Sequence, residues 1–143
     1  MRIEKVMAGK GAAVATVTAA STVRQALTEL ARHRIGALVV SPDGKIIEGI
    51  VSERDVVRAL EQDGPEIIDR PVSSIMSTDL YTCRPEDEVD SIMALMTAKR
   101  IRHVPVLQDG ALAGIVSIGD VVKSRIDELE GDRKALVDFI YAR

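Results

Sequence analysis

The sequence predicts an α/β (α+β) fold in which two β-α-β-β-α repeats pack as a pseudo-twofold module, followed by an extra C-terminal helix. The main observation is an internal repeat. The chain has 143 residues, enough for one ordinary domain or for two half-size units that share a core. Hydrophobic residues make up 46% of the chain and charged residues 29%, as in globular proteins. Two units that fold together are therefore expected.

The repeat becomes visible when the chain is compared with itself. Residues 35–57, IGALVVSPDGKIIEGIVSERDVV, align with residues 101–122, IRHVPVLQDGALAGIVSIGDVV. After one extra residue in the first copy, residues 49–52 fall on residues 114–117. Each copy extends over about sixty residues, a unit too small to cover a three-stranded sheet alone. The two copies are therefore expected to pack against each other.

Each copy is expected to contain a first amphipathic helix between short strands. Apolar residues recur at helical spacing at positions 23, 26, 27 and 30, and again at 89, 92, 93 and 96. Asp43-Gly44 and Asp109-Gly110 supply the turn between two strands in each copy. The strands are expected at residues 16–18, 37–40 and 48–51 in the first copy and at residues 82–84, 104–106 and 113–116 in the second.

Breaks in this pattern divide the chain into four segments. Gly64, Pro65 and Pro71 end the second helix of the first copy and make a linker. Beyond the second copy, apolar residues continue at helical spacing to Ile140, with an interruption expected at Gly131. This tail either covers a flank of the module or forms a contact surface for a second chain. The segments are 1–62 (first repeat), 63–74 (linker), 75–130 (second repeat) and 131–143 (C-terminal helical tail).

Composition and charge disfavour several classes of function. One Phe, two Tyr and no Trp leave few rings on which single-stranded nucleic acid could stack. The formal net charge of -3 is opposite to that of a typical duplex-binding protein. No run approaches the roughly 18 apolar residues that a membrane span needs. Cys83, His33 and His103 cannot build an internal disulfide or the usual Cys/His metal site, so a cytoplasmic protein is expected.

Residues that could carry catalysis do not form a recognised pattern. Cys83 falls on Val17 in the repeat register, so a buried apolar role is expected for it. The stretch Gly9-Lys10-Gly11 lacks the strand and helix context of a phosphate loop and is expected to be flexible backbone. The chain is therefore expected not to be an enzyme.

The repeated polar motif is Ser-x-x-Asp where the second helix of each copy begins: Ser52 with Asp55, and Ser117 with Asp120. One interpretation is a capping box, which satisfies free N–H groups at a helix start. The other is a ligand site, because a helix N-terminus attracts anions and a carboxylate can accept two hydrogen bonds from a ribose diol. The Gly-apolar-apolar sequence before each Ser favours the second interpretation, since it brings bare backbone to the junction. The residues alone leave both interpretations open.

A basic segment precedes the first long strand of each copy. In the second copy it is Lys99-Arg100-Ile101-Arg102-His103, and in the first it is His33-Arg34 followed by Ile35-Gly36. Such side chains either solvate a helix end and favour its negative dipole terminus, or hold a phosphate by charge-assisted hydrogen bonds.

The strings GIVSERDVV and GIVSIGDVV, preceded by IGALVV and RHVPV, resemble the cystathionine-β-synthase (CBS) domain family. The resemblance covers residues 3–124 as a tandem pair, including the lead-ins Val6-Met7 and Ile75-Met76. It implies a stand-alone pair, or Bateman module, with two clefts that bind adenosine-containing ligands. AMP is the foremost expectation, with ADP, ATP, NAD or S-adenosylmethionine as alternatives, and no catalytic cofactor is implied. The module would be a homodimer with a regulatory or an energy- or redox-sensing role that acts on an unidentified protein in trans. The alternative is a scaffold whose Ser-x-x-Asp motifs only cap helices.

The resemblance also implies which residues form each cleft. Each cleft combines the Asp of one copy with two groups of residues from the other copy: those of its lead-in strand and those just before its first long strand. Asp55 and Asp120 would bind ribose, with Ser52 and Ser117 close to ribose or phosphate. Gly36 stands opposite Arg102 in the repeat register, so charge placement predicts tighter binding in the Asp120 cleft. The Asp120 cleft would use Ser117, Ile115, Arg102 and His103 with Ala15, Ile35, Gly36 and Arg54, and the Asp55 cleft would use Ser52 and Ile50 with Tyr81, Ile101 and Arg102.

Overall fold

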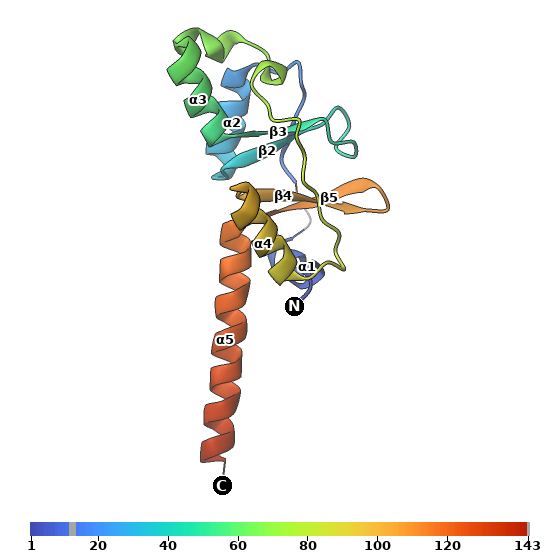
Figure 1. Cartoon of the computed structure of the whole chain (residues 1–143), viewed down its shortest axis with the longest axis vertical. Coiled ribbons are helices and arrows are strands. Elements are labelled where there is room, and N and C mark those ends of the chain that lie inside the picture. Colours follow the sequence, from blue (N-terminus) through green and yellow to red (C-terminus); the bar gives the residue numbers. More distant parts are fainter. Residues whose placement is uncertain (12–13, 143) are drawn as a thin grey trace.

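The two repeats form two lobes that lie one above the other, and a long C-terminal helix extends away from the lower lobe (Figure 1). The structure is a computed structural model that describes residues 1–11 and 14–142. Each lobe holds a small sheet flanked by helices, which confirms the α/β class and the paired repeats predicted from the sequence. Within the described residues, no helix combines the length and the apolar character required to cross a membrane.

The first lobe contains a three-stranded sheet in the order β1-β2-β3, with β1 parallel to β2 and β2 antiparallel to β3. Every residue of β2 is buried, so this strand forms the centre of the core. Ala26 and Leu30, on one face of the first helix, belong to the same core cluster. The elements are β1 (Thr16–Val17), α2 (Val23–His33), β2 (Ala37–Val40), β3 (Gly49–Ser52) and α3 (Glu53–Asp63).

The second lobe repeats this plan with a shorter first strand. Its strand predicted at residues 82–84 is reduced to a single parallel bridge between Cys83 and Val106, which corresponds to the pairing of Val17 with Val40 in the first lobe. Cys83 is buried in the core, as its alignment with Val17 predicts. The elements are α4 (Val89–Lys99), β4 (His103–Gln108), β5 (Ala111–Ser117) and α5 (Ile118–Tyr141).

Each lobe is completed by a segment that precedes the other repeat in the chain. Helix α1 (Ile3–Lys10) packs on the second lobe, where the backbone N–H of Ile3 donates to Asp87 at 2.9 Å and the Ile3 side chain enters the core. The 3-10 helices η1 (Pro65–Asp69) and η2 (Val72–Ser74) pack on the first lobe instead. This exchange of lead-in segments ties the two lobes together.

The exchange explains the glycine that precedes Ile-Val-Ser in each repeat. A Cβ atom added at Gly49 would lie 2.8 Å from the Met76 sulfur and 2.9 Å from the Ser77 carbonyl oxygen. At Gly114 the same atom would collide with the side chain of Met7. The sequence predicts that this bare backbone faces a ligand, and the structure corrects the prediction: the lead-in methionine of the other repeat occupies that space.

Two further sequence predictions are wrong. Gly9 and Lys10 belong to α1 and are not a flexible loop, because packing of the Ile3 and Val6 side chains on the second lobe stabilises this helix. Helix α5 runs through Gly131 without a break. An interior glycine costs a helix about 1 kcal/mol relative to Ala, which is too little to interrupt the helix-forming residues on either side.

Candidate functional site

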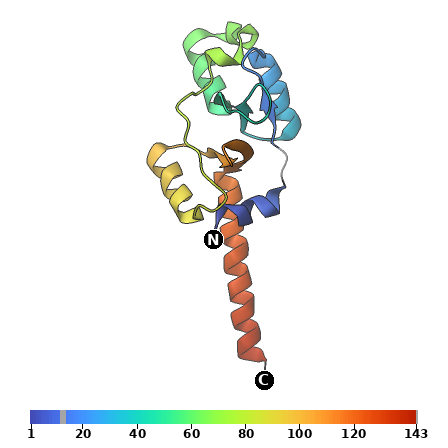
Figure 2. The same cartoon turned by 90° about the vertical axis from the view of Figure 1, so that its right-hand side faces the viewer.

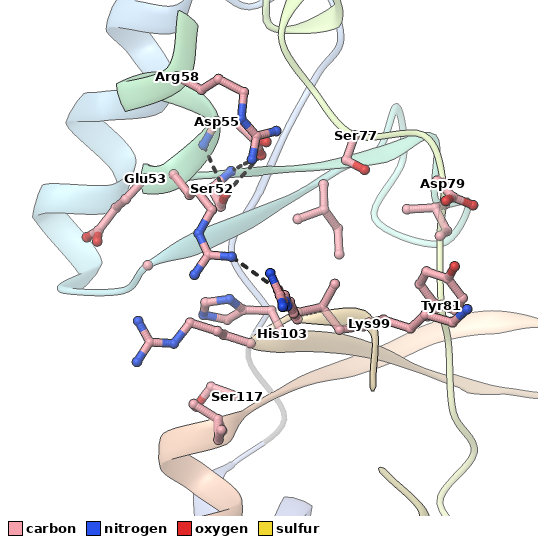
Figure 3. Close-up of a pocket in the computed structure, with 18 of the residues that line it drawn as sticks. Ser52, Glu53, Asp55, Arg58, Ser77, Asp79, Tyr81, Lys99, His103 and Ser117 are labelled. Carbon is pink, nitrogen blue, oxygen red and sulfur yellow. Dashed lines mark hydrogen bonds between the residues drawn. The ribbon is translucent and has the colours of Figure 1, made fainter. Parts of the chain in front are cut away.

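A cleft of about 600 Å³ lies between the two lobes. Figure 3 shows its labelled side chains, which come from both repeats. Its volume falls in the range of small-molecule binding sites. The lining consists of Gly36, Ile50, residues 52–55 and Arg58 from the first lobe, residues 77 and 79–81 from the second lead-in, and residues 99–103 and 117–119 from the second lobe.

Asp55 lies in the first turn of α3, at the wall of this cleft. Its Oδ2 atom accepts hydrogen bonds from the Ser52 N–H at 2.8 Å and from the Ser52 hydroxyl at 2.9 Å. In return, Ser52 Oγ accepts from the Asp55 N–H at 3.3 Å, which completes a capping box. Asp55 Oδ1 accepts no hydrogen bond from any residue that the structure describes. The carboxylate therefore caps the helix with Oδ2 alone.

The cleft has an excess of positive charge. Five cationic side chains line it, against the three carboxylates of Glu53, Asp55 and Asp79. Arg54 also links the two lobes, because its Nη1 donates to the Arg100 carbonyl at 3.1 Å. This excess and the N-terminus of α3 favour an anionic ligand. The cations are Arg54, Arg58, Lys99, Arg100 and Arg102.

Tyr81 gives the cleft one aromatic side chain, which lies beside Lys99 at the end formed by the second lead-in (Figure 3). The ammonium of Lys99 lies 5.5 Å from the centre of the Tyr81 ring, a cation–π distance. Ile50, Leu80 and Ile101 add apolar surface to the lining. A flat apolar ring with an anionic group attached would suit this combination.

Asp120, the equivalent residue in the second repeat, has a different environment. Its Oδ2 accepts hydrogen bonds from the Ser117 N–H at 2.9 Å and from Lys10 Nζ at 2.6 Å. The same Nζ donates to the Ile115 carbonyl at 2.7 Å. Burial alone would raise the pKa of Asp120, but the hydrogen bonds from Lys10 and Ser117 outweigh it and hold the pKa below its ordinary value. Lys10 therefore pairs with the carboxylate that the sequence predicts to bind ribose, through Oδ2, while Asp120 Oδ1 accepts no hydrogen bond from the described residues.

His103 lies at the boundary between the lobes. Its ring is close to Gly36, where an added Cβ would lie 3.3 Å from His103 Cε1. Burial, followed by the positive charges of Lys10 and Arg102, lowers the pKa of His103, although Asp120 and Glu53 act in the opposite direction. His103 is therefore neutral at pH 7 and contributes a hydrogen-bonding ring, not a cation, to the cleft.

The structure brings together most of the residues that the sequence assigned to two clefts. Four lie elsewhere: Asp120 and Ile115 contact Lys10, while Ala15 and Ile35 pack against the core of the first lobe. Whether the residues in the cleft bind a ligand stays a prediction. Those that line the cleft are Gly36, Ile50, Ser52, Arg54, Asp55, Tyr81, Ile101, Arg102, His103 and Ser117.

Sequence reasoning missed several residues of the cleft. Arg58 could have been found, since it follows Asp55 by three positions and lies on the same face of α3. Ser77 and Asp79 follow the lead-in Ile75-Met76, whose exchange between lobes the repeat alone does not indicate. Lys10 gave no signal, because its contact with Asp120 joins residues 110 positions apart.

The comparison with protein families identifies the repeats. The model of the CBS domain matches residues 11–62 and 72–127. This chain belongs to the CBS domain family. The two matches make it a tandem CBS pair, as the sequence motifs predict.

Individual relatives agree with this assignment. The chain is 38% identical over 127 residues to the mitochondrial CBS domain-containing protein CBSX3 of Arabidopsis thaliana. The match covers 86% of this chain and 62% of CBSX3, so this chain spans less than two thirds of the length of CBSX3. A crystal structure of a CBS-domain-containing protein from Agrobacterium tumefaciens is 38% identical, with a TM-score of 0.84, and the match covers 87% of this chain and 99% of that one. A CBS domain protein from Pyrobaculum aerophilum, solved in complex with AMP, is 30% identical with a TM-score of 0.74, covering 84% of this chain and 89% of that one.

Proposed function

We propose that this CBS pair is a regulatory module that binds an adenine nucleotide in the cleft beside Asp55. Asp55 Oδ1 would accept hydrogen bonds from the ribose hydroxyls, and the cations of the cleft would hold the phosphate. The observation that carries the proposal is the place of the Asp55 carboxylate at the cleft wall, where Oδ2 caps α3 and Oδ1 accepts no hydrogen bond from a described residue. Asp120, by contrast, is paired with Lys10.

The surroundings of Asp55 support this ligand class. A charged acceptor binds a diol strongly, and arginines close to a helix N-terminus favour phosphate. Tyr81, Ile50 and Ile101 offer apolar surface for the base. The Pyrobaculum aerophilum relative was solved with AMP, which makes AMP the first ligand to test. ADP, ATP, NAD and S-adenosylmethionine are the alternatives, and the extension of the cleft to residues 117–119 favours testing the longer ligands.

We assign the module a regulatory role in which it transmits nucleotide binding to a protein partner in trans and does not catalyse a reaction. The cleft presents groups that recognise a ligand, namely a capped carboxylate, hydroxyls and guanidinium groups. The chain's single thiol is poorly suited to nucleophilic chemistry, because burial raises the pKa of Cys83 to about 12. The proposed compartment is the cytoplasm, where adenine nucleotides are available.

A homodimer is part of this proposal. Val57 on α3 and Val122 on α5 occupy equivalent positions of the two repeats, and both are exposed, at 66% and 45%. Large apolar side chains exposed at matching positions suit a twofold interface, since each lobe presents the same kind of surface.

A scaffold function is the second candidate. It is favoured by the complete capping boxes at both Ser52-Asp55 and Ser117-Asp120, which would be kept even if no ligand bound. Capping alone gives each motif a structural role.

Calorimetric titration of AMP into the parent protein and into Asp55→Asn decides between these functions. Asn keeps an oxygen for the cap but loses the charge that the ribose would meet, so we expect affinity to fall about tenfold or more. Asp120→Asn is the matched control and should bind AMP as the parent does. If Asp55→Asn loses stability toward denaturant but binds AMP unchanged, Asp55 is only a cap and its assignment to the ribose is wrong. If the parent binds no adenine nucleotide, the scaffold function is correct.

A further inference from the structure

Helix α5 extends beyond the lobe that it belongs to. At 1.5 Å per residue, its 24 residues extend over about 36 Å. The first half contacts α1 and α4, with Val121 buried and Arg125 donating to Asp90 at 2.6 Å. From Leu129 onward every described residue of the helix is exposed, and Figures 1 and 2 both show this half extending away from the lobes.

An apolar stripe follows the exposed side of the whole helix. Its spacing alternates between four and three residues, which is the pattern of the a and d positions of a coiled coil. The side chains of the stripe are between 45% and 62% exposed. The lobe covers the neighbouring face of the helix, on which Val121, Ser124 and Glu128 lie, and leaves the stripe open. The stripe consists of Val122, Ile126, Leu129, Leu136 and Ile140, with Arg133 in the remaining position.

The exposed half of α5 has little to stabilise it alone. Short helices without tertiary contacts are marginal in water, and Gly131 lowers helix stability by about a further 1 kcal/mol. A helix with an uncovered apolar stripe is stabilised when the stripe packs on another apolar surface. The stripe of a second copy has the same spacing and is therefore complementary to it.

The charges beside the stripe indicate the orientation of such a pair. The first half of α5 carries Lys123 and Arg125 at the flanks of the stripe, and the second half carries Glu130 and Asp132. When two copies run antiparallel, these two basic side chains lie beside the two acidic side chains of the other helix. A parallel pair would place the two Arg133 side chains opposite each other, where like charges repel.

We propose that α5 forms an antiparallel coiled coil with α5 of a second copy of this chain. The inference rests on the proposed homodimer and specifies one of its interfaces. In the pair, Ile126 packs against Leu129 of the partner subunit. Lys123 lies beside Glu130 of the partner subunit. Arg125, which donates to Asp90 of its own chain, lies on the side of Asp132 of the partner subunit, and each arrangement occurs twice because of the twofold axis.

The first test measures the mass of the full chain by sedimentation between about 1 and 100 μM, the range in which many weak dimers dissociate. Leu129→Glu should shift the dimer midpoint to at least tenfold higher concentration, because it puts a charge into the stripe. Ile46→Glu is the matched control, since Ile46 is equally exposed but lies far from α5 in the chain. Circular dichroism at high concentration checks that each variant is folded.

The second test determines the orientation. Lys123→Glu should weaken the dimer, and adding Glu130→Lys should restore it, because the two residues meet in an antiparallel pair. In a parallel pair Glu130 lies beside Arg125 of the partner subunit, so the double variant would be weaker than the single one and would overturn the proposed orientation.

The outcomes separate this inference from the proposed function. A parent chain that stays monomeric overturns both the homodimer and the α5 pair, while nucleotide binding is judged by calorimetry alone. A dimer that survives Leu129→Glu unchanged overturns the α5 pair and leaves the homodimer in place. Loss of the dimer in Leu129→Glu but not in Ile46→Glu, with rescue by charge exchange, supports the α5 pair.

Discussion

Lys10 Nζ lies 2.6 Å from Asp120 Oδ2 and joins the N-terminal helix to the first turn of α5. The same ammonium donates to the Ile115 carbonyl, so it is held by two acceptors of the second lobe. In the first repeat, Asp55 forms the same capping box, but no cation of the described residues forms an ion pair with it. The two repeats therefore share a motif and differ in the state of its carboxylate.

Removing the Lys10 ammonium should make Asp120 available to a ligand. We expect Lys10→Ala to bind a second AMP per chain, because the Asp120 carboxylate loses the cation that pairs with it and its charge is left for the ribose hydroxyls. Calorimetric titration measures the number of sites in the parent and in the variant. Lys5→Ala, an exposed lysine of the same helix, is the control and should leave that number unchanged. A variant that still binds one AMP at Asp55 would show that Lys10 does not limit the second site.

The Lys10–Asp120 pair should also contribute to stability in a pH-dependent way. The pKa of Asp120 is lower in the folded chain than its ordinary value, so the pair stabilises the fold fully above about pH 4. This contribution is lost as the pH falls through the lowered folded pKa. Denaturant unfolding between about pH 6 and pH 3 should therefore show a smaller loss of stability for Asp120→Asn than for the parent. Equal losses in the two proteins would contradict the prediction.

His103 should titrate below the ordinary histidine pKa. Burial, reinforced by Lys10 and Arg102, opposes its protonation, and the carboxylates of Asp120 and Glu53 offset this only in part. The titration of the ring protons by NMR should have a midpoint under about 6.5. His33→Gln identifies the resonance, since His103 is then the only histidine left. A midpoint at or above 6.5 would mean that the ring is not held in the buried, cationic environment described.

Sequence predicted the parts of this structure that depend on local patterns. The strand at residues 37–40 matches β2, and the helices after Ser52 and Ser117 begin where the capping motif places them. Local periodicity decides these elements, because a buried strand and an amphipathic helix leave their pattern within a few residues.

The exchange of lead-in segments could not be predicted in the same way. Met7 packs on Gly114, and Met76 on Gly49, through contacts between residues far apart in the chain. Hydrophobic periodicity is a local pattern and does not indicate such a contact. The glycines could therefore be interpreted as part of a ligand site. The same limit hid Lys10 and therefore the difference between the environments of Asp55 and Asp120.

The two glycines should respond differently to substitution by Ala. At Gly114 the added methyl group meets only the flexible side chain of Met7, whereas at Gly49 it meets the Met76 sulfur and also the Ser77 carbonyl oxygen at 2.9 Å. A side chain can move aside, but this carbonyl is held because the Ser77 oxygen accepts from the Ile50 N–H at 3.0 Å. Overpacking of this kind costs about 1–3 kcal/mol, and we expect Gly49→Ala to lose more stability than Gly114→Ala.

Shortening each methionine to Ala separates the clash with its side chain from the clash with the Ser77 carbonyl. In a Met7→Ala background, Gly114→Ala should cost much less stability than it costs in the parent, because the side chain that the new methyl group meets has been removed. In a Met76→Ala background, the cost of Gly49→Ala should fall by a smaller share, since the Ser77 carbonyl stays in place. Double-mutant cycles from denaturant unfolding give both coupling energies. Equal rescue at the two sites would mean that the backbone at residue 77 moves as easily as a side chain, contrary to its hydrogen bonding with Ile50.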